Sequence, residues 1–130
     1  MSLEIGLKGR SETVVEESNT AAAVGSGLVP VFATPYMIAL MENAAANTVA
    51  PHLEAGQGTV GTHLNVSHEA ATPIGMKVWA EALLKEVDGK RLVFEVTAYD
   101  EAGVIGRGSH ERFIINTEKF LAKCEAKKQK

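Results

Sequence analysis

Residues 31–51, VFATPYMIALMENAAANTVAP, predict one long apolar helix. Thr34 and Pro35 are typical of a helix start, because threonine is a favoured N-cap and proline at the first helical position loses no hydrogen bond. Pro51 marks the end of the segment. The apolar residues of this segment are Met37, Ile38, Leu40, Met41, Ala44, Ala45 and Val49. Because they surround most of the circumference, we expect the helix to be covered on several sides.

Glu42 is the single acidic residue within this apolar run. Burying an unpaired charge is costly, so a buried carboxylate at this position must be paired, protonated or functional. A second interpretation places Glu42 on a narrow solvent-facing stripe of the helix, together with Asn43 and Asn47. The first interpretation makes Glu42 a candidate catalytic residue.

The segment after the helix predicts a strand over residues 59–71, TVGTHLNVSHEAA, because apolar and polar residues alternate with a period of two. This alternation places His68 on the apolar face, which must meet the helix. It places Gly61 and His63 on the opposite face, and we expect the side chain of His63 to be exposed.

Four further strands are expected. The first is centred on Val14 and Val15, and the other three span residues 76–87, 91–99 and 104–120. Turn signals such as Asp88-Gly89 separate the later ones. Residues 25–30, GSGLVP, predict a loop that leads into the helix and lies near Thr34. In the last strand, Gly106 and Gly108 indicate a bulge or a close approach of another backbone.

Tight turns join antiparallel strands, whereas a parallel sheet would need helical crossovers that this sequence does not predict. We therefore expect an α+β fold in which a curved antiparallel sheet of about five strands wraps around one central helix. With 130 residues the chain is expected to form one domain over residues 1–130, with residues 121–130 as a loose basic tail. The helix rim and one sheet edge stay uncovered, which favours pairing with a second copy.

The formal net charge of −3 gives the chain no overall basic field, so nucleic acid is not an expected partner. No apolar run approaches the ~20 residues of a membrane span, and the N-terminus, MSLEIGLKGR, lacks the apolar core of a signal peptide. The single cysteine, Cys124, excludes an internal disulfide and favours a reducing, cytoplasmic location. The histidines do not fall at ligand spacing, so no metal site is expected.

Three segments of the chain resemble a known family. They are VFATPYMIALMENA (31–44), HLEAGQGTVGTHLNVSHEAATPIGMKV (52–78) and IGRGSHERFII (105–115). They are similar to the hot-dog-fold acyl-CoA thioesterases of the fluoroacetyl-CoA thioesterase-like group, over roughly residues 31–120. The resemblance implies a hot-dog fold, hydrolysis of a short-chain acyl-CoA to free acid and coenzyme A, and a homodimer with active sites at the subunit interface. Coenzyme A then belongs to the substrate, no separate cofactor is implied, and pairing of dimers into a tetramer stays open.

In this family a threonine just before the helix, a glutamate within it and a histidine on the following strand are catalytic. The matching positions are Thr34, Glu42 and His68. The residues expected to bind substrate are Phe32, Tyr36, Gly61 and Arg112. The loop before the threonine, AVGSGLVP (23–30), lacks the phenylalanines of a fluoroacetyl-specific member. The resemblance therefore supports thioester hydrolysis better than fluoroacetyl selectivity.

Thioester hydrolysis needs a nucleophile or an activated water, a proton carrier and donors for the oxyanion. We expect Glu42 to act as nucleophile or as base toward water, and His68 to carry a proton to the departing thiolate. We expect Thr34 to orient the carboxylate or the water, because its own attack needs an adjacent base. Gly61 has no side chain and allows close approach of the acyl group. Since eight helical positions span about 12 Å, one His68 cannot contact both Thr34 and Glu42, which predicts a site built from two chains.

Each candidate also has a purely structural interpretation. Thr34 is then a helix cap alone, and His68 is a hydrogen-bonded core residue. Arg112, with Arg107 or Lys77, is expected either to meet coenzyme A phosphates or to be solvated. His110 shows no convergence with the other candidates. For the whole chain, the alternatives are a hydratase or dehydratase of the same fold, disfavoured because the Asp-x-x-x-x-His pattern is not apparent, and a non-catalytic acyl-CoA-binding protein.

Overall fold

The computed structural model of this protein describes residues 3–129. Its strands are β1 (Lys8–Val14), β2 (Gln57–His68), β3 (Lys77–Asp88), β4 (Arg91–Asp100) and β5 (Gly103–Asn116). Its α-helices are α1 (Ala21–Val24), α2 (Thr34–Val49) and α3 (Thr117–Glu125). Three short 3-10 helices complete the described residues, namely η1 (Glu17–Asn19), η2 (Ala50–His52) and η3 (Ala126–Gln129).

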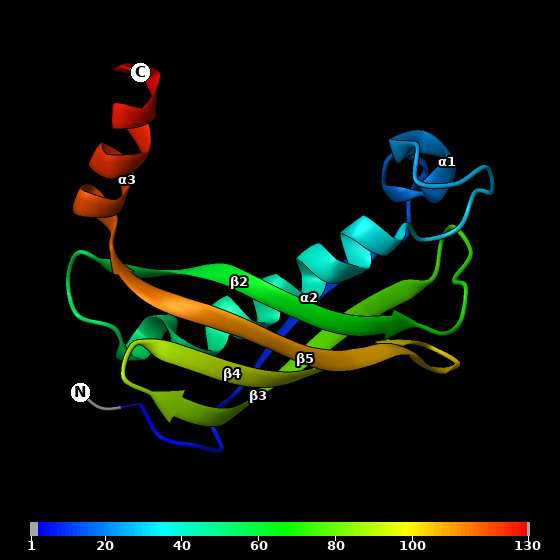
Figure 1. Ribbon diagram of the computed structural model, residues 1–130. Helices are drawn as coiled ribbons and strands as arrows, with labels where there is room; N and C mark the ends of the chain where they lie inside the picture. The colour runs from blue at the N-terminus through cyan, green and yellow to red at the C-terminus, as the bar shows by residue number, and fades with distance from the viewer. Residues whose placement is uncertain (1–2, 130) are drawn as a thin grey trace.

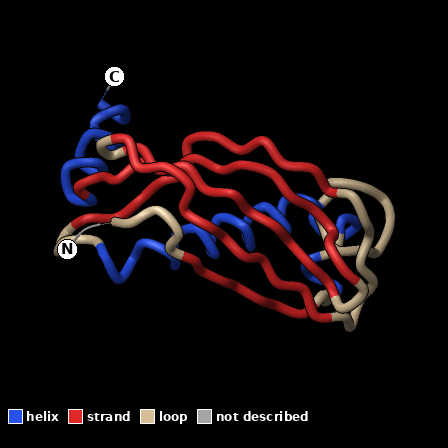
Figure 2. The backbone as a smooth tube through the Cα atoms, turned by 90° about the horizontal axis from the view of Figure 1, so that it is seen from below, coloured by secondary structure: helices blue, strands red, loops and turns tan. Residues whose placement is uncertain are grey.

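The five strands form one antiparallel sheet in the order β1-β3-β4-β5-β2. The long helix α2 lies against one face of this sheet (Figure 1). Figure 2 gives the same arrangement from below, with α2 running lengthwise along the curved sheet. The predicted α+β architecture, with about five antiparallel strands around one central helix, is confirmed.

The core lies between α2 and the inner face of the sheet. Alternate residues of β3 and β4 are buried, as the period of a strand requires when one face is covered. The largest fully buried apolar side chains in this layer are Met37, Met41, Val49, Val78, Leu84, Leu92, Phe94 and Val96. Burial of each side chain of this size stabilises the fold by roughly 1.5–3 kcal/mol. A Cβ on Gly9 would lie 2.6 Å from the carbonyl oxygen of Ala44, so a glycine lets α2 pass close to β1.

The start of α2 differs from the prediction. The N-cap is Ala33, Thr34 is the first helical residue, and no side chain caps the free N–H groups. The predicted N-cap role of Thr34 is therefore wrong, because its hydroxyl is hydrogen-bonded to His68 instead. At the other end, α2 stops at Val49, and Pro51 lies in η2.

The two ends of the chain contain more helix than expected. The first strand ends at Val14 instead of continuing past it, and η1 and α1 follow. The last strand ends at Asn116, whose side chain accepts a hydrogen bond from the backbone N–H of Lys119 at 3.0 Å and so caps α3. Residues 121–129 are helical rather than a loose tail, and Lys130 lies outside the described residues. Figure 1 shows α3 projecting away from the sheet.

A β-bulge in β2 changes which residues face the helix. The register with β5 shifts between Gly61 and His63, so Thr62 has no partner on β5. Beyond the bulge His68 faces the helix and His63 is exposed, as expected. Before it the alternation is reversed, and Gly61 faces α2. The predicted placement of Gly61 on the outer face is therefore wrong, because a period-two pattern assumes an unbroken ladder.

The glycines of β5 allow the close approach that the sequence indicated. A Cβ on Gly106 would lie 2.7 Å from Sδ of Met37 on α2, and one on Gly108 would overlap the backbone of β2. The register between β4 and β5 also shifts beside Gly106, where Ile105 has no partner on β4. The register shift of the sheet and the close approach of α2 therefore both occur at Gly106.

Candidate active site

A threonine–histidine pair lies at the start of α2. The hydroxyl oxygen of Thr34 is 2.7 Å from Nδ1 of His68, which ends β2. Burial lowers the pKa of the His68 imidazole from its ordinary value of 6.5, so the ring is neutral at pH 7. Its Nε2 atom is buried and has no hydrogen-bond partner among the described residues. We call Thr34 and His68 the Thr34 pair; it has the geometry of a hydroxyl next to a proton acceptor.

The Thr34 pair borders a cleft with a volume of about 240 Å³. Phe32, which is 1% exposed, lines this cleft, as does Ser26 from the loop predicted to lie near Thr34. Isolated β-bridges join Phe32 to Thr20 and Val31 to Pro73, so the segment before α2 is held in place. The tip of the loop is open to solvent, and Leu28 is 97% exposed.

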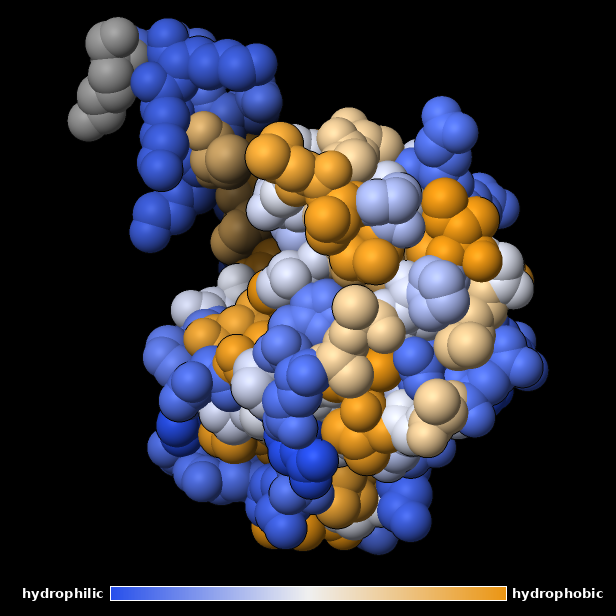
Figure 3. Space-filling model, turned by 90° about the vertical axis from the view of Figure 1, so that its right-hand side faces the viewer, coloured by the Kyte–Doolittle hydropathy of each residue, from blue (hydrophilic) through white to orange (hydrophobic). Residues whose placement is uncertain are grey.

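Figure 3 looks onto the end of the molecule that carries α1 and this loop, and hydrophobic surface gathers there between polar areas. Tyr36 is 44% exposed and does not line the cleft. Phe32 does line the cleft, and the roles of both residues in binding substrate stay predictions.

A second group of polar residues surrounds Glu42, in the middle of α2. Oε2 of Glu42 lies 3.7 Å from Nη1 of Arg112. A Cβ on Gly61 would lie 2.7 Å from the same carboxylate oxygen, 3.1 Å from Cε1 of His110 and 3.3 Å from Nη1 of Arg112. We call Glu42, Gly61, His110 and Arg112 the Glu42 cluster. Its glycine leaves the carboxylate accessible, and the Glu42 side chain is 39% exposed.

The interpretation that groups Glu42 with Asn43 and Asn47 is wrong. These asparagines lie against β1, where Asn43 accepts a hydrogen bond from Ser11 at 2.7 Å and Asn47 donates one to the carbonyl oxygen of Arg10 at 3.3 Å. Glu42 instead faces β2 and β5. The carboxylate is therefore paired with a cation, which is one of the outcomes expected for an acid in an apolar helix.

The other two members of the Glu42 cluster differ from expectation. Arg112 is 8% exposed, so its interpretation as a solvated strand arginine is wrong. His110 is fully buried and touches Arg112, so it does converge with the other candidates. The alternative phosphate-binding cations lie at the surface and pair with acids, Arg107 with Glu69 at 3.1 Å and Lys77 with Glu12 at 3.7 Å.

A single chain does not bring the three predicted catalytic residues together. Thr34 and His68 are in contact, while Glu42 belongs to a separate cluster eight helical positions, or about 12 Å, along α2. Within residues 3–129, no group of three His, Cys, Asp or Glu residues is arranged to hold a metal ion. The described helices include none that is long and apolar enough to cross a membrane.

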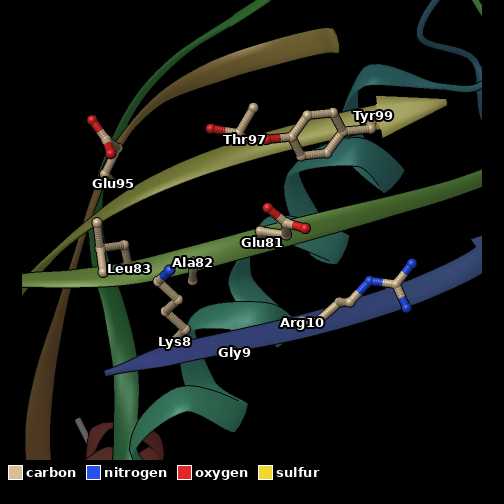
Figure 4. Close-up of a pocket in the computed structure, with 9 residues that line it drawn as sticks. All are labelled: Lys8, Gly9, Arg10, Glu81, Ala82, Leu83, Glu95, Thr97 and Tyr99. Carbon is tan, nitrogen blue, oxygen red and sulfur yellow. The ribbon is translucent and has the colours of Figure 1, made fainter. Parts of the chain in front are cut away.

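A separate groove of about 590 Å³ lies over β1, β3 and β4. Figure 4 shows its side chains on the face of the sheet turned away from α2. The charged residues that line it are two basic residues, Lys8 and Arg10, and two acidic residues, Glu81 and Glu95, so their charges cancel. It contains none of the residues predicted to bind or react with substrate, so we place the candidate active site at α2.

Comparisons with known proteins identify the relatives of this chain. The family model described as fluoroacetyl-CoA-specific thioesterase matches residues 15–118. The fluoroacetyl-CoA thioesterase of Streptantibioticus cattleyicolor is 48% identical over 97 residues, covering 75% of this chain and 70% of that protein. A solved structure of fluoroacetyl-CoA thioesterase is 38% identical, with a TM-score of 0.92 and 98% of each chain covered.

A hot-dog-like protein from Thermanaerovibrio acidaminovorans shows the same fold at 23% identity, with a TM-score of 0.84, 95% of this chain and 91% of that chain covered. The family match spans α2 and both groups of site residues. This chain therefore has the hot-dog fold and belongs to the fluoroacetyl-CoA-specific thioesterase family.

Proposed function

We propose that this protein hydrolyses the thioester bond of a short-chain acyl-CoA, releasing the free acid and coenzyme A. The observation that carries this proposal is the contact of 2.7 Å between the Thr34 hydroxyl and the half-buried imidazole of His68. A neutral imidazole beside a hydroxyl is equipped for proton transfer near pH 7. The bordering cleft of about 240 Å³ suits a small acyl group.

We further propose that each active site combines the Thr34 pair of one chain with the Glu42 cluster of a second. The strand β2 is at the edge of the sheet, and within the described residues it pairs only with β5. An edge strand of twelve residues can pair with its own copy across a two-fold axis. If that axis lies between Leu64 and Asn65, Gly61 stands opposite the partner subunit's His68. The homodimer is thus the arrangement that completes the site, and its pairing into a tetramer is not required for activity.

In the proposed reaction, Glu42 takes a proton from a water molecule as the water oxygen attacks the thioester carbonyl carbon. The tetrahedral intermediate collapses, the C–S bond breaks, and the proton that Glu42 took from the water passes through His68 to the departing thiolate, which returns both residues to their starting states. The Thr34 hydroxyl holds the imidazole through their hydrogen bond. Gly61 leaves room for the acyl group beside the carboxylate. Coenzyme A enters as part of the substrate, and both the lack of a separate cofactor and the cytoplasmic location remain predictions.

One contact favours a second route. Attack by Thr34 was disfavoured from sequence because no base was expected beside it, yet His68 lies within hydrogen-bond distance. In this route the Thr34 oxygen attacks the carbonyl carbon and His68 accepts its proton; the C–S bond then breaks, and His68 passes this proton to the departing thiolate. Water then hydrolyses the acyl-threonine, as His68 takes a proton from the water and returns it to the Thr34 oxygen. Mass spectrometry of rapidly quenched enzyme separates the routes, since only the second adds one acyl group to Thr34.

Release of free thiol from a panel of short and medium acyl-CoAs tests the proposed function, with the wild type measured beside Glu42→Gln. Glu54→Gln is the matched control, because Glu54 is an exposed loop residue away from both groups. We expect hydrolysis of a short member by the wild type and the control, and its loss in Glu42→Gln. Binding of every ester without thiol release would support the acyl-CoA-binding alternative. Hydration of an enoyl-CoA without thiol release would support the hydratase.

A further inference from the structure

His110 is a buried polar residue that the proposed reaction does not use. It lies in the interior of the sheet, paired with Leu64 on β2 and Phe94 on β4, and it is 0% exposed. Its ring packs at a tilt against Phe94, with centroids 6.3 Å apart. Buried polar atoms are stable only when they are hydrogen-bonded, so the partners of its two nitrogens define what this residue does.

These partners determine the tautomer of His110. Nδ1 lies 2.9 Å from the carbonyl oxygen of His63. A carbonyl oxygen only accepts hydrogen bonds, so Nδ1 carries the proton and donates it. Nε2 then presents a lone pair, and it accepts a hydrogen bond from Nη1 of Arg112 at 3.1 Å. The neutral imidazole thus connects the backbone of β2 to a buried guanidinium.

The guanidinium of Arg112 is held on three sides. Nε donates to Oγ1 of Thr59 at 2.9 Å, Nη2 donates to the Thr59 carbonyl oxygen at 3.0 Å, and Nη1 donates to His110. Arginine has two N–H groups on Nη1, and one remains free to face Oε2 of Glu42 at 3.7 Å. The two contacts with Thr59 set the plane of the rigid guanidinium, and the contact with His110 adds a direct restraint on Nη1, the nitrogen that faces the carboxylate.

The carbonyl oxygen that His110 binds belongs to the residue after the β2 bulge. The bulge is the register shift between Gly61 and His63. It turns Gly61 toward α2, where a Cβ would come within 2.7 Å of the Glu42 carboxylate. A hydrogen bond to the His63 carbonyl therefore stabilises the backbone geometry that keeps space open beside Glu42.

We infer that His110 is a positioning residue of the active site, which aims the Arg112 guanidinium at Glu42 and holds the β2 bulge that brings Gly61 to the same carboxylate. This inference rests on the proposed function. The charged groups that face the ring are Arg112 on its own strand and Glu42 on α2. Protonation of Nε2 would place two cations in contact, so the arrangement requires a neutral ring. Burial lowers the pKa of His110, which keeps it neutral.

Two substitutions separate the two contacts. In His110→Asn, the amide nitrogen takes the place of Nδ1 and still donates to the His63 carbonyl, but the acceptor for Arg112 is lost. In His110→Gln, the longer side chain places an amide oxygen near the position of Nε2 and can still accept from Arg112. We expect His110→Asn to lower kcat by about 10²-fold with little change in KM, because the carboxylate is misplaced. We expect His110→Gln to recover most of kcat.

The split between kcat and KM distinguishes positioning from a general loss of packing. A misplaced carboxylate lowers kcat with little change in KM, whereas a loosened site raises KM as well. His52→Gln, a histidine substitution outside the site, should match the wild type in both constants. Circular dichroism and thermal unfolding establish that each variant is folded.

A folded His110→Asn with wild-type kcat would overturn the inference, while the wild type still released thiol and the proposed function stood. A wild type that hydrolyses no acyl-CoA would overturn both. If neither His110 variant folds, Thr59→Val replaces them, because it removes one acceptor of Arg112 at a half-buried position. A lower kcat with little change in KM would then support the inference, and a wild-type kcat would contradict it.

Discussion

The Thr34 pair and the Glu42 cluster lie on the same helix but are built differently. The Thr34 pair is one hydrogen bond between the ends of two elements, and it borders an open cleft. In the Glu42 cluster, a buried guanidinium is fixed by β2 and β5 on several sides. The first is suited to moving protons, and the second to holding a charged group in one place. Neither contains all the groups that thioester hydrolysis needs, which is why we combine them across two chains.

The largest effects should come from removing the proton-transfer group of either region. Glu42→Gln and His68→Asn should each lower kcat by about 10²-fold or more, because each removes a general acid–base group. Thiol release under saturating substrate measures the loss. If Glu42→Gln kept more than half of the wild-type kcat, the Glu42 cluster would not take part in the reaction. The same result for His68→Asn would exclude the Thr34 pair.

Gly61→Ala tests the space beside the carboxylate. The new methyl group would lie 2.7 Å from Oε2 of Glu42 and must displace it, so we expect kcat to fall by about 10- to 100-fold. The methyl group would also press on Cε1 of His110 at 3.1 Å and Nη1 of Arg112 at 3.3 Å, which are held by hydrogen bonds, so the free energy of unfolding should fall by about 1–3 kcal/mol. Gly58→Ala on the same strand is the matched control, since its methyl group would meet only Oγ1 of Thr117 at 3.2 Å. Equal activity of the two variants would show that Gly61 is not adjacent to the reacting groups.

Substitutions of Thr34 test whether the hydroxyl of this residue contributes to activity. Thr34→Val keeps the shape but removes the hydrogen bond to His68, and we expect kcat to fall by about 10-fold. Thr34→Ser keeps the hydroxyl and should retain most of the activity. If serine and valine were equally impaired, the methyl group of Thr34 and not its hydroxyl would matter.

The pH dependence of stability should be the smallest effect. Burial lowers the pKa of His110 below the unfolded value of 6.5, so the unfolded chain binds more protons as the pH falls through this range. Stability from the neutral ring is therefore present above pH 6.5 and is lost as the pH falls toward the lowered folded value. The melting temperature should drop by a few degrees in this window, and by less in His110→Gln. An equal drop in both proteins would exclude His110 as its source.

The parts of the site that the sequence revealed are those where a polar residue interrupts an apolar pattern. Glu42 in an apolar helix and His68 on an apolar strand face were identified in this way, and tight turns indicated the antiparallel sheet. The bulge at Thr62 could not be found, because both faces of that part of β2 carry small or polar residues. Because the bulge was not predicted, Gly61 was placed on the wrong face of the strand.

His110 was missed, and the buried position of Arg112 was not predicted, for a related reason. On β5 they share the inner face with Gly106 and Gly108, which carry no apolar side chain to mark that face. Only the paired strands show that these positions point at α2. The start of α3 did carry a signal, since asparagine is a favoured N-cap, and Asn116 takes that role. The strand prediction extended past it to Phe120, which was counted as a strand residue.

Subunit mixing tests most directly whether the two regions form one site across two chains. His68→Ala and Glu42→Gln proteins are each inactive in this account, but their mixed dimer contains one site with an intact Thr34 pair and an intact Glu42 cluster. After exchange of subunits at equal concentrations, about a quarter of the wild-type activity should return. Mixing His68→Ala with Thr34→Ala, which damage the same region, should restore none. No recovery with the first combination, under conditions where exchange is verified, would contradict the shared site.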